Sequence, residues 1–353
     1  MRKTATWWRI GLVAAVIAGV LVVAGPALAL TITGAGASFP APLYQKWSKD
    51  YKRATNVKVN YQSVGSGTGI AQIKAGNVNF GASDKPTTRS DLNSWGLVQF
   101  PSCVGGVVPI VHVNSIGSGK IKLTGAVLAK IYEGKITNWN DSRIKSLNHG
   151  VNLPKNLKIK VVHRSDASGT TWIFTHYLKA VDPSGWKWAD MSGSWPVGTG
   201  ASGNQGVATF VKSSAYNGAI GYVEYAYALQ SHIPYTQLKN RSGKWVLPSY
   251  TTFKGAASHA SYAWKDGFVT NLVNMKGTKS WPITGATYIL VKRSQKTMAT
   301  GHGILAFFNW AYTSSKGIGD AKSLQYVPLP SSAVKKVKAM WHTNVKAGGK
   351  PCW

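Results

Sequence analysis

Residue types that bind anions lie close together at Arg164, Ser168, Gly169 and Thr170, with Asp166 among them. Ser168, Gly169 and Thr170 directly precede the periodic segment 173–180, so they lie where the first N–H groups of a helix have no intrahelical partner. Such N–H groups, two hydroxyls and the positive end of a helix dipole favour a bound anion. The guanidinium adds a planar set of donors that suits phosphate or carboxylate, and the carboxylate two residues later is close enough to orient it. An ordinary capped helix remains the alternative for this stretch alone.

Two further glycine-rich stretches have the same design. Residues 33–42 place Ser38 and Phe39 before a helical pattern, and residues 63–69 place Ser66 between glycines before another. Neither stretch matches a nucleotide site, because the first lacks the third glycine and the downstream acid of a dinucleotide fingerprint. No P-loop sequence occurs in the chain. We therefore expect three anion-binding loops without a nucleotide cofactor.

Asp84 ends the short predicted strand 78–84, as the other polar loops follow their own strands. Ligands of open α/β sheets bind beyond the carboxyl ends of strands, so we expect Asp84 to join the three loops. A turn or helix cap is the alternative. An ionised carboxylate only accepts hydrogen bonds, and phosphate keeps an O–H at neutral pH whereas sulfate has none. Facing Asp84, sulfate would leave a buried acceptor unpaired, which favours a protonated oxyanion as the ligand.

Catalytic motifs are absent from the sequence. No G-x-S-x-G or H-E-x-x-H sequence occurs, and the eight histidines have no paired spacing. His163 is next to Arg164, but strand alternation places it on the opposite face. A secreted phosphatase would need metal ligands from several Asp and His residues, and only Asp84 and Asp166 are available. We expect a binding protein with no cofactor and no metal, and a phosphatase is the alternative.

The elements that must position these residues alternate between strands and helices. Helical patterns occur at 43–55, 70–75, 90–94, 124–134, 173–180, 206–211, 303–315 and 331–343, and strand patterns at 57–61, 78–84, 104–113, 158–162 and 280–291. Residues 218–227 indicate a strand followed by a helix. The runs 104–113 and 280–291 are interpreted as two passages between domains, and the Gly, Ser and Trp-rich loop 193–206 as either a cleft lining or a solvent loop.

The amino terminus indicates secretion. Basic residues, an apolar run over 10–23 and small residues up to Ala29 predict a signal peptide, residues 1–29. The apolar run is short for a membrane span, and no cysteine lies near the cleavage point to carry a lipid. The remaining chain is long enough for two domains. Cys103 and Cys352 have no metal-site spacing, and the sequence leaves open whether they form a disulfide.

The chain is strongly basic, with 41 Lys and Arg against 11 Asp and Glu and a net charge of +30. Its lysines are scattered singly instead of forming an arm or a stripe, so nucleic acid is not the expected partner. A surface poor in carboxylates has little to protonate, which fits an acidic medium. A positive field also draws small anions to the protein.

The motifs together resemble a known family. Residues 34–42, 64–67, 80–84 and 164–170 are similar to the periplasmic phosphate-binding protein of bacterial phosphate ABC transporters, and residues 105–108, 131–136, 218–225 and 281–284 extend the resemblance. It implies a type II periplasmic binding protein, an α/β fold of two domains joined by a double crossover with the ligand cleft between them. Ser38 stands where the family often has threonine, which retains the hydroxyl.

The resemblance also implies the domains, the site and the partners. Domain I would comprise residues 30–108 and 285–353, and domain II residues 109–284. Phosphate contact would fall to Ala37, Ser38, Phe39, Ser66, Asp84, Arg164, Ser168, Gly169 and Thr170. The protein would be a periplasmic monomer that closes over inorganic phosphate and delivers it to an inner-membrane ABC permease. Arsenate, another protonated oxyanion, is the alternative ligand.

Overall fold

The structure, a computed structural model, describes residues 30–188, 190–191 and 195–353. The predicted signal peptide, residues 1–29, therefore lies outside the described residues, as does part of the predicted loop 193–206. None of the helices in the described ranges is long and apolar enough to cross a membrane.

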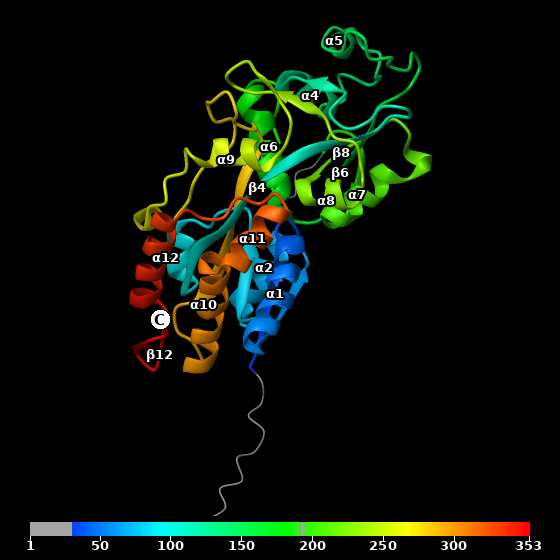
Figure 1. The fold of residues 1–353 in the computed structure, drawn as a ribbon. Helices are drawn as coiled ribbons and strands as arrows, with labels where there is room; N and C mark the ends of the chain where they lie inside the picture. Colours follow the sequence, from blue (N-terminus) through cyan, green and yellow to red (C-terminus); the bar gives the residue numbers. More distant parts are fainter. Residues whose placement is uncertain (1–29, 189, 192–194) are drawn as a thin grey trace, which may run out of the picture.

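An eight-stranded sheet runs through the molecule in the order β2-β1-β3-β11-β4-β8-β6-β7. Its strands are β1 (Thr31–Gly36), β2 (Lys58–Ser63), β3 (Phe80–Ser83), β4 (Leu97–His112), β6 (Lys160–Arg164), β7 (Thr199–Ala201), β8 (Ala219–Glu224) and β11 (Thr284–Lys292). Strand β4 pairs antiparallel with β11 up to Gly106 and with β8 from Val107 onward. This one strand joins a lower half, which contains β1, β2, β3 and β11, to an upper half, which contains β8, β6 and β7 (Figure 1).

The lower half packs its helices around an aromatic core. These helices are α1 (Ala41–Thr55), α2 (Ser66–Ala75), α3 (Arg89–Ser94), α10 (Met298–Thr313), α11 (Ser315–Ser323) and α12 (Ser331–Asn344). Phe308 of α10 lies edge-on to Tyr44, Phe80 and Phe100, with ring centroids 5.3 to 6.2 Å apart. The carboxyl-terminal helices α10 and α11 thus pack against α1, in the half that begins with β1.

The upper half carries α4 (Gly125–Tyr132), α5 (Ser142–Lys145), α6 (Gly169–Val181), α7 (Gly203–Lys212) and α8 (Tyr225–Gln230), with a small sheet of β5 (Lys122–Leu123), β9 (Gln237–Lys239) and β10 (Trp245–Val246). Phe174 of α6 stacks on Tyr222 of β8 at 4.2 Å between ring centroids. Tyr222 Oη also accepts from Arg164 N at 3.2 Å and bonds the Thr171 hydroxyl at 2.7 Å, which holds the amino-terminal end of α6 against the end of β6.

Residues 199–206 are not the loop that their composition predicts. They form β7 and the first turn of α7, because β7 pairs in parallel with β6 and Asn204 is completely buried. The predicted loop is therefore wrong for this part, and the predicted helix 206–211 begins earlier.

One later segment returns from the upper to the lower half before β11. After α9 (Tyr250–Ala257), the short helix η2 (Trp264–Asp266) packs on the lower half. Gln99 Nε2 donates to Gly267 O at 2.8 Å, and Thr270 N donates to Tyr288 Oη at 3.0 Å. Residues 264–270, which the predicted boundaries place in domain II, thus contact the lower half.

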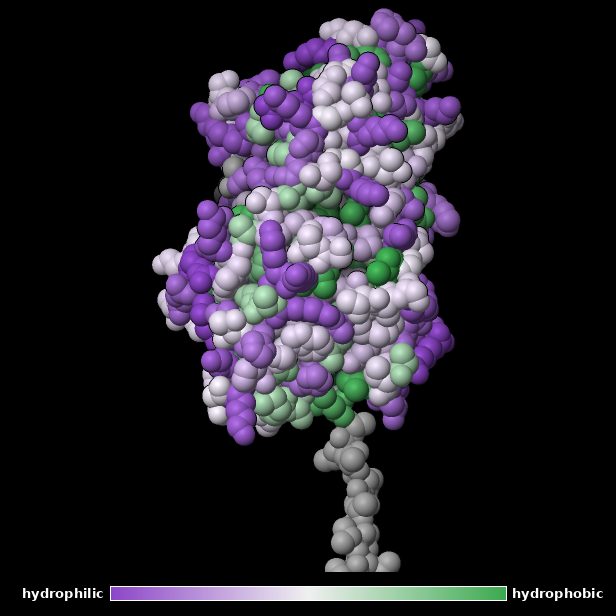
Figure 2. Space-filling model, turned by 60° about the vertical axis from the view of Figure 1, so that its left-hand side comes forward, coloured by the Kyte–Doolittle hydropathy of each residue, from purple (hydrophilic) through white to green (hydrophobic). Residues whose placement is uncertain are grey.

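The structure also shows the state of the two cysteines and the distribution of hydrophilic side chains. Cys103 and Cys352 are both buried free thiols. Hydrophilic side chains cover both halves of the face shown in Figure 2 without gathering into one stripe. The fold class predicted from the sequence, an α/β fold of two domains joined by a double crossover, is confirmed.

Candidate functional site

The predicted polar loops meet where the two halves touch. Ser38 follows β1, Ser66 begins α2 and Asp84 follows β3, all in the lower half. Arg164 ends β6 and Thr170 begins α6, both in the upper half. All five are buried, none more than 3% exposed. The carboxyl ends of parallel strands and the amino-terminal ends of two helices thus converge, and helix dipoles there favour an anion.

Arg164 is held by Asp166 and keeps one nitrogen without a partner. Its Nε donates to Asp166 Oδ1 at 2.6 Å and its Nη2 donates to Oδ2. Burial alone raises the pKa of Asp166, but the bonds and charge of Arg164 and the N–H of Gly203 outweigh it and lower the pKa. Within the described chain, the buried Nη1 of Arg164 has no hydrogen-bond partner. The guanidinium is therefore fixed with a free donor.

Asp84 is the acceptor in the same site. Its Oδ1 accepts from the Thr287 hydroxyl at 2.6 Å, while its buried Oδ2 has no partner among the described residues. Burial raises the pKa of Asp84 to about 7, against the opposing effects of the Thr287 bond and the Arg164 charge. An acceptor left unpaired in a buried site costs free energy unless a donor reaches it. One buried acceptor and one buried cationic donor thus remain available to a ligand.

Ser66 and Gly169 bring the halves into direct contact. Ser66 Oγ accepts from Gly169 N of the upper half at 3.1 Å and from Asp84 N at 3.2 Å. A Cβ on Gly169 would lie 2.5 Å from Ser66 Oγ and 2.6 Å from Asp84 Cβ. Any larger residue at 169 would force the halves apart, so glycine is required for this approach. Both N–H donors occupy the serine's lone pairs, which leaves its O–H to donate elsewhere.

The loop after β1 supplies further donors. Within the described chain, the backbone N–H groups of Ser38 and Phe39, like that of Thr170, donate to no protein group. Ala37 is different, because its N–H donates to Ala82 O at 2.9 Å and its carbonyl accepts from Tyr61 Oη at 2.6 Å. Ser168 caps α6 by accepting from Thr171 N at 3.0 Å. These residues lie at the same junction of the two halves, although the N–H and carbonyl groups of Ala37 are paired within the protein and the Ser168 hydroxyl caps α6.

Sequence reasoning missed the residues that support this site from elsewhere in the chain. Asn204 of α7 contacts Ser38 and Thr170. Tyr326 Oη lies 2.7 Å from both Phe39 O and Glu224 Oε2, so it links the loop after β1 to Glu224. Burial raises the pKa of Glu224 well above its usual value. The G-N-Q-G sequence around Asn204 resembles a loop, so no local pattern identifies it as part of the site.

Further contacts between the two halves surround the contact that Ser66 makes with Gly169. Lys85 Nζ of the lower half lies 3.4 Å from Asp190 Oδ1 of the upper half. Tyr227 Oη of the upper half donates to Ser38 O at 2.8 Å. Gly65, which has a φ of +90°, leaves no room for a Cβ because Asp166 Oδ2 would lie 2.5 Å from it. These contacts from both halves describe a closed arrangement.

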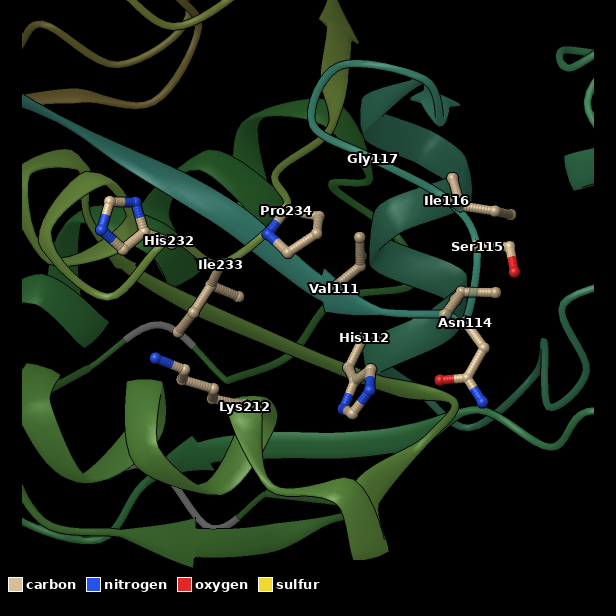
Figure 3. A pocket seen from close by; sticks show the side chains of 11 residues that line it. Val111, His112, Asn114, Ser115, Ile116, Gly117, Lys212, His232, Ile233 and Pro234 are labelled. Atoms are coloured by element: carbon tan, nitrogen blue, oxygen red, sulfur yellow. The ribbon is translucent and has the colours of Figure 1, made fainter.

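A different hollow lies in the upper half, at the end of β4. It has a volume of about 430 Å³ and is bordered by His112, Lys212 and His232, with Asn114 and Ser115 on the side away from His232 (Figure 3). None of the predicted site residues lines it. It contains no arginine and no carboxylate, so it lacks the chemistry of the closed site. In the described ranges, no group of three or more His, Cys, Asp or Glu residues is arranged to hold a metal.

Comparisons with known proteins find phosphate-binding proteins, both by sequence and by structure. Residues 22–315 match the family model described as a PBP superfamily domain. The phosphate-binding protein PstS of Xylella fastidiosa (strain 9a5c) is 48% identical over 318 residues, 89% of this chain and 86% of that protein. PstS of Haemophilus influenzae is 47% identical over 91% of this chain and 95% of its own. The structure of a high-affinity periplasmic phosphate-binding protein, PfluDING, bound with phosphate, has a TM-score of 0.73 at 22% identity, covering 91% of this chain and 96% of that one.

Proposed function

The chain belongs to the PstS family of phosphate-binding proteins within the PBP superfamily, and from this premise we propose how it binds inorganic phosphate for import by an ABC transporter. The ion lies between the two halves, in contact with Asp84 and Arg164. The backbone N–H groups of Ser38, Phe39 and Thr170 and the hydroxyls of the site surround it. Ser66, Ser168 and Gly169 complete the contact set.

One observation carries the proposal: Asp84 Oδ2 and Arg164 Nη1 are both buried and both without a protein partner in the described chain. Buried polar atoms are normally satisfied, so a ligand that donates to one and accepts from the other fits the site. Phosphate does both, because it carries an O–H beside its charged oxygens at neutral pH. Sulfate only accepts, and it would leave Asp84 unpaired.

Charge balance in the site follows from the same groups. Arg164 is paired with Asp166 through two hydrogen bonds, so part of its positive charge is already offset before a ligand binds to its remaining donor. Neutral N–H and O–H donors and two helix ends must then stabilise the remaining charge of the anion. Burial raises the pKa of Asp84 to about 7, so at a pH above this value the carboxyl group is ionised and can only accept hydrogen bonds.

Closure of the halves is the step that completes the shell. Ser38 and Asp84 come from one half and Arg164 and Thr170 from the other, so only the closed arrangement assembles all donors with the acceptor. We further propose that the protein works as a periplasmic monomer and that the closed form docks on an inner-membrane ABC permease. The family is one of phosphate-binding transport proteins, which favours a receptor over a phosphatase.

Isothermal titration calorimetry of the chain without residues 1–29 tests the function. We expect tight one-to-one binding of phosphate and no measurable binding of sulfate at a pH above the Asp84 pKa of about 7. Arsenate shares the protonation of phosphate and is expected to bind as well. Equal binding of sulfate and phosphate would refute a phosphate receptor and leave only a general anion pocket.

A further inference from the structure

Asn204 lies completely buried at the start of α7, and the direction of its amide group is fixed by its neighbours. Its Oδ1 accepts from Glu224 N at 2.9 Å. A backbone N–H can only donate, so the oxygen must be on this side and the Nδ2 group must be on the other. Asn204 therefore presents two N–H donors toward the anion site.

These donors reach hydroxyls from both halves of the molecule. Asn204 Nδ2 donates to Ser38 Oγ at 2.8 Å and to Thr170 Oγ1 at 3.1 Å. The backbone N–H of Asn204 also donates to Ser38 Oγ, at 3.2 Å. A hydroxyl has two lone pairs and one O–H, so both lone pairs of Ser38 are occupied and its proton must point to another group. The Thr170 hydroxyl accepts one hydrogen bond from Asn204, which favours its O–H as a donor toward another group.

We propose that Asn204 is a positioning residue that turns the Ser38 and Thr170 hydroxyls into donors toward the bound anion, and that it does so on closure. Ser38 belongs to the lower half and Asn204 to the upper half, so the bonds between them form only when the halves meet. The inference rests on the proposed function and deepens it. It leaves Asp84 Oδ2, buried and without a partner among the described residues, as the acceptor for the proton of the oxyanion.

These hydrogen bonds from Asn204 explain how neutral hydroxyls can discriminate between protonated and unprotonated ligand oxygens. An unconstrained serine can donate or accept and would tolerate either form of an oxyanion oxygen. With both lone pairs occupied, the Ser38 hydroxyl can only donate, so it stabilises a ligand oxygen that accepts a hydrogen bond. The protonated oxygen of the ligand is then directed to Asp84. Asn204 thus determines specificity without being a contact that the proposed ligand requires.

The test replaces only the donating half of the amide. Asn204→Asp keeps the oxygen that accepts from Glu224 and puts an acceptor in front of Ser38 and Thr170, whose hydroxyls then turn toward the new carboxylate. Loss of hydrogen bonds to a charged ligand predicts a phosphate Kd raised on the order of 10- to 100-fold. Gln205→Glu, on the same helix but exposed, makes the same change of charge and should alter the Kd less than about twofold.

A double-mutant cycle separates a role through the hydroxyl from a structural one. If Asn204 acts through Ser38, the fold-increase in Kd caused by Asn204→Asp should be smaller in a Ser38→Ala background, by at least about threefold. Repulsion between the new carboxylate and the anion is present in both backgrounds and cancels. Thermal melting without phosphate confirms that each variant is folded, and Asn204→Ala is taken through the same cycle if Asn204→Asp does not fold.

The outcomes are distinct. Coupling between positions 204 and 38, with the Gln205→Glu control unchanged, supports the inference. A wild-type-like Kd for Asn204→Asp, or a cost that is the same in both backgrounds, overturns it while the proposed function stands. A wild-type chain that does not bind phosphate overturns the proposed function itself, and this inference with it.

Discussion

Asp84→Asn is the substitution that best distinguishes a phosphate receptor from a general anion pocket. The Asp84 carboxyl group is buried, with Oδ1 accepting from Thr287 at 2.6 Å and Oδ2 unpartnered in the described chain. In the variant, the amide oxygen can keep the bond with Thr287, so the NH2 group replaces Oδ2 on the ligand side. A position that only accepts becomes one that donates, and sulfate no longer meets a like charge or an unpaired acceptor.

The expected change in selectivity follows from the free-energy cost that sulfate no longer meets in the variant. A buried unpaired charge beside a like-charged ligand costs roughly 2 to 4 kcal/mol, so the ratio of sulfate to phosphate Kd should fall about 30- to 900-fold in the variant. Most of the change should be a gain in sulfate affinity. Protonation of Asp84 has the same effect, so the selectivity of the wild type should narrow as the pH drops through about 7.

Competition calorimetry with both anions, at a pH above 7, measures the two dissociation constants for wild type and Asp84→Asn. A variant that still excludes sulfate as strongly as the wild type would refute the role of Asp84. So would a wild-type selectivity that stays constant as the carboxyl group titrates.

Three more expectations follow from the same structure. Arg164→Ala should weaken phosphate binding by roughly 2 to 4 kcal/mol, because it removes the buried cation while Asp166 stays behind. Lys74→Ala, at an exposed position of α2, should change the Kd little. Equal Kd values for the two variants would show that the site is elsewhere. Small-angle scattering should record a smaller radius of gyration with phosphate than without it, and an unchanged radius in a sample shown to bind phosphate would argue against closure. The phosphate-free protein should unfold at a higher temperature near pH 5 than at pH 8, because burial raises the pKa values of Asp84 and Glu224 and the cost of burying their charges disappears as they protonate. Paired carboxylates such as Asp50, whose pKa is lowered, should lose their contribution to stability only below about pH 3.8. A melting temperature that falls steadily from pH 8 to pH 5 would contradict this expectation.

The anion loops could be predicted from the sequence because their signals are local. Ser168 to Thr170 stand between a strand and a helix, and Arg164 and Asp166 are two residues apart, so strand and helix rules alone place their donors together. Asp84 was predicted in the same way, from its place at a strand end. In each case the residues that bind are adjacent to the elements that position them.

The supporting residues could not be found in this way, because they reach the site through tertiary packing. Thr287 bonds Asp84 across 203 positions and Asn204 bonds Ser38 across 166. Both contacts depend on the order of strands in the sheet, which brings β11 beside β3 and α7 over β8. Helix α11 was missed for a different reason, since two glycines in Ser315–Ser323 weaken its helical pattern although its Gly317 carbonyl accepts from Trp47.

The most direct measurement is the crystal structure of the protein without residues 1–29, grown with phosphate. We expect one phosphate ion between the two halves, with one oxygen within hydrogen-bond distance of Asp84 Oδ2 and another within that distance of Arg164 Nη1. A phosphate ion bound instead in the hollow beside His112 and Lys212, with the site between the halves lacking one, would contradict it.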